Sequence, residues 1–304
     1  MRWIVAALAM LCTSAWADYS DETHRLLRAN RDTYGRVIHL FGASISRGWA
    51  LRTFPDIASD EVRSSTAWPL RSPASMLNLL IADAGLAHEW VAAYGSDLGF
   101  PDDERIAQNA GYLADLVAQN VIRLGDLVVL EDAGLHPRDP DKYEAQWRKL
   151  LEVIAPSGAR MVMVEMFDYI TDEKVGEDPA DSYQFSVPFK GYVTKAVRTH
   201  NQATVTAAKA FNVPVLPLKR RMDDYRTTAL ARFQTNPIHP DGIHPNIWGQ
   251  CVFAALIADA AKLPPQRGAS FTQAFMRADP WKGRARTEEM MDLCLNPTPT
   301  MLTK

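Results

Sequence analysis

The sequence predicts an α/β protein of three layers, in which helices cover both faces of a five-stranded parallel sheet. Short apolar runs alternate along the chain with longer segments whose apolar residues recur at helical spacing. The run at residues 128–130 is apolar on both faces of its expected strand, as in a buried parallel sheet. With 47% hydrophobic and 23% charged residues among 304, the chain has the composition of a globular protein with a sizeable core.

The first strand is expected at residues 36–41, an apolar run that ends at Gly42. Residues 72–84 carry apolar side chains at helical spacing and stop at Gly85, a common helix terminator. The second strand is expected at residues 88–94, before a loop that contains glycine.

Residues 102–118 are expected to form a helix, because acidic side chains fill the first turn and apolar ones line one face. Residues 126–131 are the third strand. Residues 141–154 form the next helix, which Pro156 and Gly158 close.

The fourth strand is expected at residues 160–167 and the fifth at residues 213–218, with a helix at residues 191–211 between them. The last long helix is expected at residues 245–261, and it begins with proline, whose missing N–H costs nothing there. This alternation implies parallel βαβ units whose functional site lies on loops at the carboxyl ends of the strands.

Residues 1–17 have the features of a secretory signal peptide: a positive start, an apolar stretch and the small-x-small site Ala15-Trp16-Ala17. The apolar stretch is shorter than the roughly 20 residues of a permanent membrane span. We therefore expect cleavage after Ala17 and a secreted or periplasmic mature chain without a membrane span; a buried amino-terminal helix is the alternative.

One domain is expected to span residues 18–262, followed by a carboxyl-terminal extension at residues 263–304 that packs on the domain or trails from it. Residues 171–188 form a polar loop that could cover the site as a lid. The formal net charge of −3 gives no electrostatic basis for a nucleic-acid partner. After cleavage only Cys251 and Cys294 remain; they could pair in an oxidising compartment or stay as two buried thiols.

Two segments carry candidate catalytic residues. Ser44 follows the first strand at a tight turn, where its hydroxyl could act as a nucleophile beside backbone N–H groups. His244 lies three residues after Asp241, which could orient its imidazole as a general base. The same segment, with His239 and His136, also permits a metal site.

Together the two segments resemble the SGNH (GDSL-type) hydrolases. Residues 241–246, Asp-Gly-Ile-His-Pro-Asn, are similar to the last block of that family, and residues 42–46, Gly-Ala-Ser-Ile-Ser, are similar to its first block. The resemblance implies a flavodoxin-like fold and an esterase that needs no metal or organic cofactor. It implies Ser44 as nucleophile, His244 as base and Asp241 as the residue that orients it.

The resemblance also implies an oxyanion hole formed by the backbone N–H of Ser44 and of Gly99, with Gly95 as the fallback if the alignment shifts. The first block is degenerate, because Ala43 stands where the family has aspartate. The third block is atypical too: Asp132 is nearest to the expected asparagine, and an ionised carboxylate would repel an oxyanion. The alternative donors that we considered are His136, Arg47 and Arg138.

The expected function is therefore a secreted or periplasmic esterase that acts through an acyl-enzyme on a small-molecule or polysaccharide ester. An O-acetyl ester of a carbohydrate is the first expectation and a short-chain or lipid ester the second, and Trp49 is the candidate for substrate contact. Two alternatives remain open from the sequence: an O-acyltransferase that uses the same triad, and a non-catalytic binding protein on the same fold.

Overall fold

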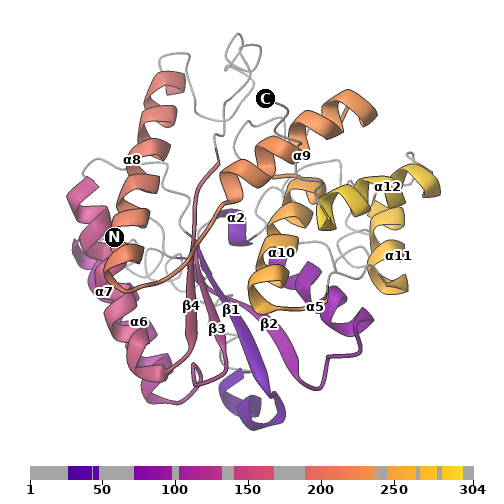
Figure 1. Ribbon diagram of the computed structural model, residues 1–304. Coiled ribbons are helices and arrows are strands. Elements are labelled where there is room, and N and C mark those ends of the chain that lie inside the picture. Colours follow the sequence, from indigo (N-terminus) through magenta and orange to yellow (C-terminus); the bar gives the residue numbers. More distant parts are fainter. Residues whose placement is uncertain are drawn as a thin grey trace, which may run out of the picture.

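The five strands of the protein form one parallel sheet. The computed structural model describes residues 27–42, 44–47, 72–97, 103–131, 140–167, 189–235, 237, 245–264, 268–278 and 283–296. The strands lie in the order β2-β1-β3-β4-β5, and each neighbouring pair is parallel (Figure 1). This is the flavodoxin-like strand order, in which ligands bind beyond the carboxyl ends of β1 and β3, the neighbouring strands at which the strand order reverses direction. The predicted fold class is confirmed. The strand bounds are β1 (Arg36–Gly42), β2 (Trp90–Asp97), β3 (Leu127–Leu130), β4 (Arg160–Val164) and β5 (Val215–Leu216).

Helices cover both faces of this sheet. In Figure 1, α6, α7 and α8 lie on one side of it, and α5 and α9 to α12 lie on the other. The described helices are α2 (Ser44–Arg47), α5 (Pro73–Asp83), α6 (Asp103–Ala118), α7 (Pro140–Ile154), α8 (Phe189–Ala210), α9 (Leu218–Phe233), α10 (Ile247–Ala261), α11 (Ala269–Ala278) and α12 (Arg284–Leu295), with 3-10 turns η1 (Arg31–Thr33) and η4 (Ala155–Ser157).

Strand β1 shows why the chain forms this sandwich. Its side chains are buried on both faces: Val37 and Phe41 pack with α6 and α7, whereas Ile38 and Leu40 pack with α5 and α10. Successive side chains of a strand point to opposite faces, so a strand with apolar side chains on both faces requires a cover on each side. Full burial of each such side chain contributes about 1.5–3 kcal/mol.

Helix α9 is one of the elements that the apolar pattern does not predict. It occupies residues 218–233, and the predicted strand at residues 213–218 shortens to β5, of two residues. The buried positions of α9 recur every three or four residues, at Leu218, Met222, Tyr225, Ala229 and Phe233. Charged side chains fill most of the other positions of its first half, which hides this narrow apolar stripe in the sequence.

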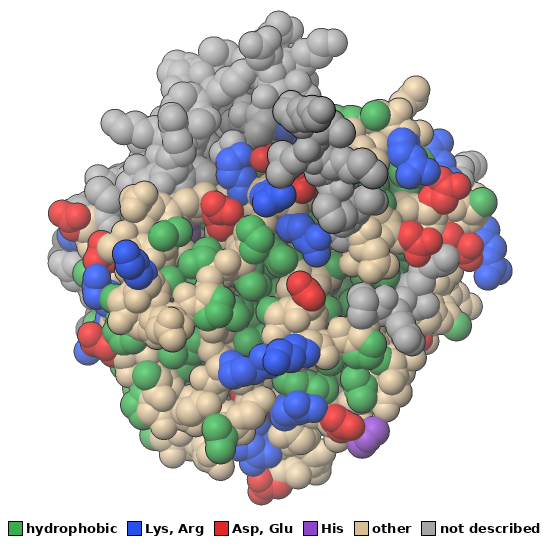
Figure 2. Space-filling view, viewed as in Figure 1, with side chains coloured by type: hydrophobic (Ala, Val, Ile, Leu, Met, Phe, Trp, Pro, Cys, Tyr) green, Lys and Arg blue, Asp and Glu red, His purple; other side chains and the backbone are tan. Residues whose placement is uncertain are grey.

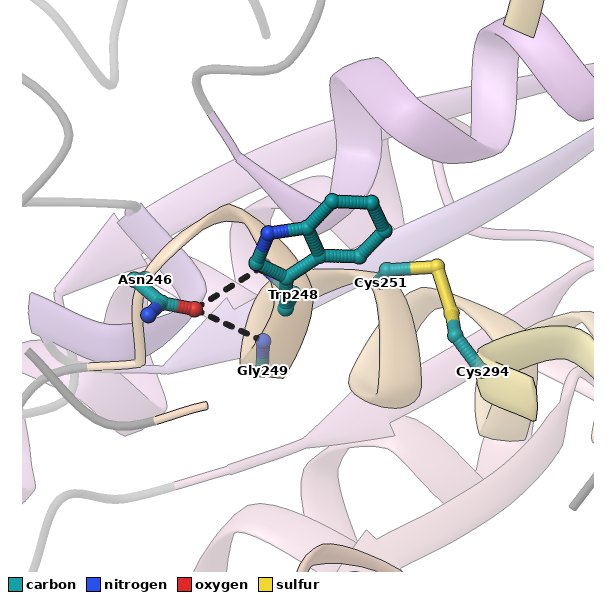
Figure 3. The surroundings of a disulfide bond; sticks show 5 residues. All are labelled: Asn246, Trp248, Gly249, Cys251 and Cys294. Atoms are coloured by element: carbon teal, nitrogen blue, oxygen red, sulfur yellow. Dashed lines mark hydrogen bonds between the residues drawn. A yellow bond between two sulfur atoms is a disulfide. The ribbon is translucent and has the colours of Figure 1, made fainter. Parts of the chain in front are cut away.

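Part of the expected carboxyl-terminal extension forms α11 and α12, which pack on α5 and α10. Asp83, the last residue of α5, accepts hydrogen bonds from the first N–H groups of α11, at Ser270 (3.1 Å) and Phe271 (2.8 Å). Cys251 of α10 and Cys294 of α12 form a disulfide with a Cα–Cα distance of 6.0 Å, which is the first of the two alternatives that the sequence left open (Figure 3).

A buried charged cluster joins β1 and β3 at their amino-terminal ends. The carboxylate of Asp126 accepts hydrogen bonds from the Arg31 guanidinium (2.6 and 2.8 Å), from His39 (3.2 Å) and from the backbone N–H groups of Val37 and Arg123 (2.9 Å each). Burial alone would raise the pKa of Asp126, but its hydrogen bonds and the nearby positive charge of a protonated His39 hold that pKa below its usual value.

The surface is mixed in character. On the face drawn in Figure 2, basic and acidic side chains are interspersed among hydrophobic ones, in keeping with the net charge of −3. Among the residues that the structure describes, no helix is both long and apolar enough to cross a membrane.

Candidate functional site

Ser44 lies at the point where the fold places a ligand site. It is the first residue of the one-turn helix α2, separated from the carboxyl end of β1 by a single residue. β1 and β3 are the neighbouring strands at which the strand order changes direction, and ligand sites lie outside their carboxyl ends. The backbone of Ser44 is thus at the predicted edge of the sheet.

The other predicted site residues are described only in part. Gly95 lies in β2 and is buried, beside the carboxyl-terminal half of β1. The remaining residues lie outside the described part of the chain: Trp49, Gly99, Asp132, His136, Arg138, His239, Asp241 and His244. The same holds for Ala43, the signal segment and the loop at residues 171–188.

The turn between β1 and α2 requires a residue without a side chain at position 42. The pairing of β1 with β2 shifts register between Leu40 and Gly42. A Cβ atom on Gly42 would collide with the carboxylate of Glu131 and with the hydroxyl of Ser46. Gly42 of the first block therefore serves close packing beneath the candidate nucleophile.

Glu131 is the residue of this site that the sequence analysis missed as functional. It directly follows β3, its backbone N–H donates to the carbonyl of Phe41 (2.8 Å), and its side chain is fully buried. Its Oε2 accepts the hydroxyl of Ser46 at 2.5 Å and the backbone N–H of Ser46 at 3.3 Å. In a single sequence, a glutamate after an apolar strand looks the same whether it holds another residue in place or only marks the end of the strand.

A second buried contact holds α2 from the side of α10. The side-chain amide of Gln250 donates to the carbonyl of Ile45 at 3.0 Å, and both residues are fully buried. Gln250 lies one turn beyond the start of α10, the helix that follows the Asp-Gly-Ile-His segment. The first segment that carries the family resemblance is therefore hydrogen-bonded to the helix that follows the second one.

Hydrogen bonds at the start of α10 hold together Pro237 and Asn246, which lie on either side of residues 238–244 in the sequence. The side chain of Asn246 caps α10 by accepting from the N–H groups of Trp248 (3.0 Å) and Gly249 (3.3 Å) (Figure 3). The backbone N–H of Asn246 donates to the carbonyl of Pro237 at 2.9 Å. A Cβ atom on Gly249 would collide with that same carbonyl, so glycine lets the two ends meet.

The three histidines in the described part of the chain are either buried in the core or exposed before β2. His39 is fully buried in β1 beside Asp126, and burial lowers its pKa although the contact with Asp126 raises it. His200 is buried between the rings of Tyr143 and Trp147, and burial lowers its pKa to about 3. His88 is exposed just before the amino-terminal end of β2.

Among the described residues, no group of three or more His, Cys, Asp or Glu side chains could hold a metal ion. The residues of the rival metal site, His136, His239, Asp241 and His244, lie outside that part of the chain.

Several solved structures are similar to this chain, whereas no family model and no curated protein matches it. An α/β hydrolase from the metagenome of Lake Arreo, Spain, is 13% identical; the match covers 76% of this chain and 97% of that one, with a TM-score of 0.49. A putative GDSL-like lipase from Parabacteroides merdae is 16% identical over 76% of this chain and 98% of that one, with a TM-score of 0.48. A variant of an acetyl xylan esterase from Geobacillus stearothermophilus is 15% identical over 77% and 98% of the two chains, with a TM-score of 0.48.

Proposed function

We propose that this chain is a secreted serine esterase of the SGNH type, with an O-acetyl ester as the first substrate class. The observation that carries the proposal is the packing at the carboxyl edge of the sheet. Helix α2, which begins at Ser44, is hydrogen-bonded to α10, and α10 begins three residues after His244. The first segment that resembles the family contains the start of α2, and the second ends at Asn246, the N-cap of α10.

In this proposal the hydroxyl of Ser44 attacks the ester carbonyl while His244 takes its proton. Asp241 holds the imidazole in the required tautomer and stabilises the imidazolium. The tetrahedral intermediate expels the alcohol, which receives the proton from His244, and leaves an acyl group on Ser44. Water, deprotonated by His244, then attacks the acyl carbonyl; the bond to Ser44 breaks, His244 returns the proton to the serine oxygen, and the acid is released. The oxyanion is stabilised by the backbone N–H of Ser44 and by that of Gly99, or of Gly95 if the alignment shifts.

The positions of the histidines support the choice of base. The chain has seven, and the three in its described part are buried in the core or exposed just before β2. Of the other four, His244 adjoins Pro245, a buried residue at the start of α10.

The disulfide supports an oxidising compartment. Disulfides form and persist in secreted and periplasmic proteins and are rare in the cytosol of mesophiles. The bond between Cys251 and Cys294 therefore fits the proposed removal of residues 1–17 during export.

Hydrolysis of p-nitrophenyl acetate by the mature chain tests the proposal, with Ser44→Ala as the matched control. We expect turnover and a single fluorophosphonate adduct by intact mass, both absent from Ser44→Ala. A chelator should leave both unchanged. A folded wild-type chain that neither turns over nor labels would refute the esterase and favour a binding protein; activity lost with chelator would favour the metal site.

The substrate class is tested separately, with acetylated xylan and a series of p-nitrophenyl esters of increasing acyl length. We expect acetate release from the polysaccharide and the highest kcat/KM for the acetyl ester. A preference for long acyl chains would replace the carbohydrate ester by a lipid ester.

A further inference from the structure

We propose that Glu131 is a positioning residue for acylation: its buried carboxylate holds Ser46, and through Ser46 it holds the turn in which Ser44 reacts. The proposal rests on the proposed esterase function and adds a residue to that site. Glu131 itself does not touch the substrate, because its side chain is fully buried beneath α2.

Helix α2 needs such support because it is only one turn long. A segment of four residues, Ser44–Arg47, forms too few backbone hydrogen bonds to hold a helical turn by itself. Its conformation must come from contacts with the rest of the fold. The buried side chain of Ile45, the hydrogen bond of its carbonyl with Gln250 and the contacts of Ser46 with Glu131 supply them.

The contact with Glu131 is the one that fixes two groups of the turn at once. A single oxygen, Oε2, accepts both the hydroxyl and the backbone N–H of Ser46. Hydrogen bonds to a carboxylate are shorter and stronger than those between neutral groups, and two donors on one acceptor restrict both the side chain and the peptide plane. Ser46 is two residues from Ser44, so this restriction reaches the nucleophile through two peptide units.

The packing around Gly42 indicates that the fold is shaped to admit this carboxylate. Gly42 leaves no room for a Cβ atom because Glu131 and Ser46 occupy that space. The carboxylate thus lies between the end of β1 and the turn that follows it. Glu131 thus supplies an ordering carboxylate at the end of β3, in a chain whose first block has alanine at position 43 where the resembled family has aspartate.

Displacement of a reacting group by about 1 Å lowers rates by about 100-fold. We therefore expect Glu131→Gln and Ser46→Ala each to lower the second-order rate of fluorophosphonate labelling of Ser44 by roughly 10- to 100-fold. Because both act on one contact, the double variant should be no slower than the slower single variant. On p-nitrophenyl acetate, kcat should fall with KM within about 2-fold, since an interaction that positions the nucleophile acts on the chemical step.

Asp83→Asn is the matched control. Like Glu131, Asp83 is a carboxylate that accepts two hydrogen bonds, in its case from two backbone N–H groups. Asp83 caps α11 and is not part of the proposed catalytic machinery. Its labelling rate should stay within about 2-fold of wild type. Amide hydrogen exchange of the peptide that contains residues 44–47 should speed up in Glu131→Gln and Ser46→Ala and not in Asp83→Asn.

The outcomes are distinguishable. If wild type labels at Ser44 and both folded variants label within 2-fold of it, the positioning role of Glu131 is refuted and the esterase stands. If wild type does not label, the esterase is refuted and the positioning role falls with it, whatever hydrogen exchange reports. If Glu131→Gln fails to fold by circular dichroism, Ser46→Ala alone decides, because it leaves the carboxylate in place.

Discussion

Reduction of the disulfide between Cys251 and Cys294 should remove a large share of the stability of this fold. The bond closes a loop of 43 residues that contains α11 and joins α10 to α12. In the chain-entropy account, a cross-link across 43 residues disfavours the unfolded chain by roughly 4 kcal/mol at 25 °C. Both sulfur atoms are buried, and reduction keeps them in place, so the difference between oxidised and reduced protein isolates loop closure from packing.

The assay is urea unfolding of the mature chain, followed by circular dichroism with and without dithiothreitol. For a slope of about 3 kcal/mol/M, a loss of 4 kcal/mol lowers the midpoint by about 1.3 M. The double variant Cys251→Ala/Cys294→Ala should not respond to dithiothreitol. If reduction, verified by thiol titration, lowers the free energy of unfolding of the wild type by less than about 1 kcal/mol, the reasoning that the disulfide stabilises the fold by loop closure is refuted.

Three further predictions concern stability. Burial keeps His200 neutral with a pKa of about 3 in the folded chain, whereas in the unfolded chain it takes up a proton below about pH 6.5. Its contribution should therefore lower the free energy of unfolding by about 1.4 kcal/mol per pH unit as the pH falls from 6.5 towards 3. Urea titrations of His200→Gln should lack that slope. Gly249→Ala places a Cβ against the carbonyl of Pro237 and should cost about 1–3 kcal/mol and slow labelling of Ser44; an unchanged melting temperature and labelling rate would contradict this. Asp126→Asn leaves the Arg31 guanidinium buried beside a neutral amide and should lower the free energy of unfolding in urea by about 3–5 kcal/mol. A loss below about 1 kcal/mol would contradict this prediction.

The sheet could be predicted because its strands are buried on both faces. Residues 37–41 are apolar except for His39, and residues 127–130 are all apolar, as expected of strands covered on both faces. Glycine or proline follows some of the intervening helices, such as those at residues 72–84 and 141–154. The length of an edge strand was not predictable in this way. β5 keeps only two paired residues, Val215 and Leu216, and only Pro217 separates it from α9.

The candidate site could be predicted only where its residues stand in short, recognisable sequence patterns. Ser44 follows a strand and His244 precedes a helix with Asp241 three residues before it, so short patterns point to all three. Glu131 and Gln250 act on α2 from positions 85 and 205 residues away from their partners. Each is an ordinary polar residue in its own segment, and only the fold gives it a partner.

Strand β3 lies between two buried carboxylates that have different roles in the described part of the chain. Asp126 precedes the strand and Glu131 follows it, and both are fully buried. The hydrogen-bond partners of the Asp126 carboxylate include residues of η1, β1 and the turn before β3, which are framework elements, so its loss should weaken the whole fold. The Glu131 carboxylate holds both the hydroxyl and the backbone N–H of Ser46, in the turn that carries the candidate nucleophile, so its loss should act on the reaction more than on stability. A strand of four residues would then anchor the sheet at one end and order the active turn at the other, which is the arrangement expected where ligand sites follow the carboxyl ends of parallel strands.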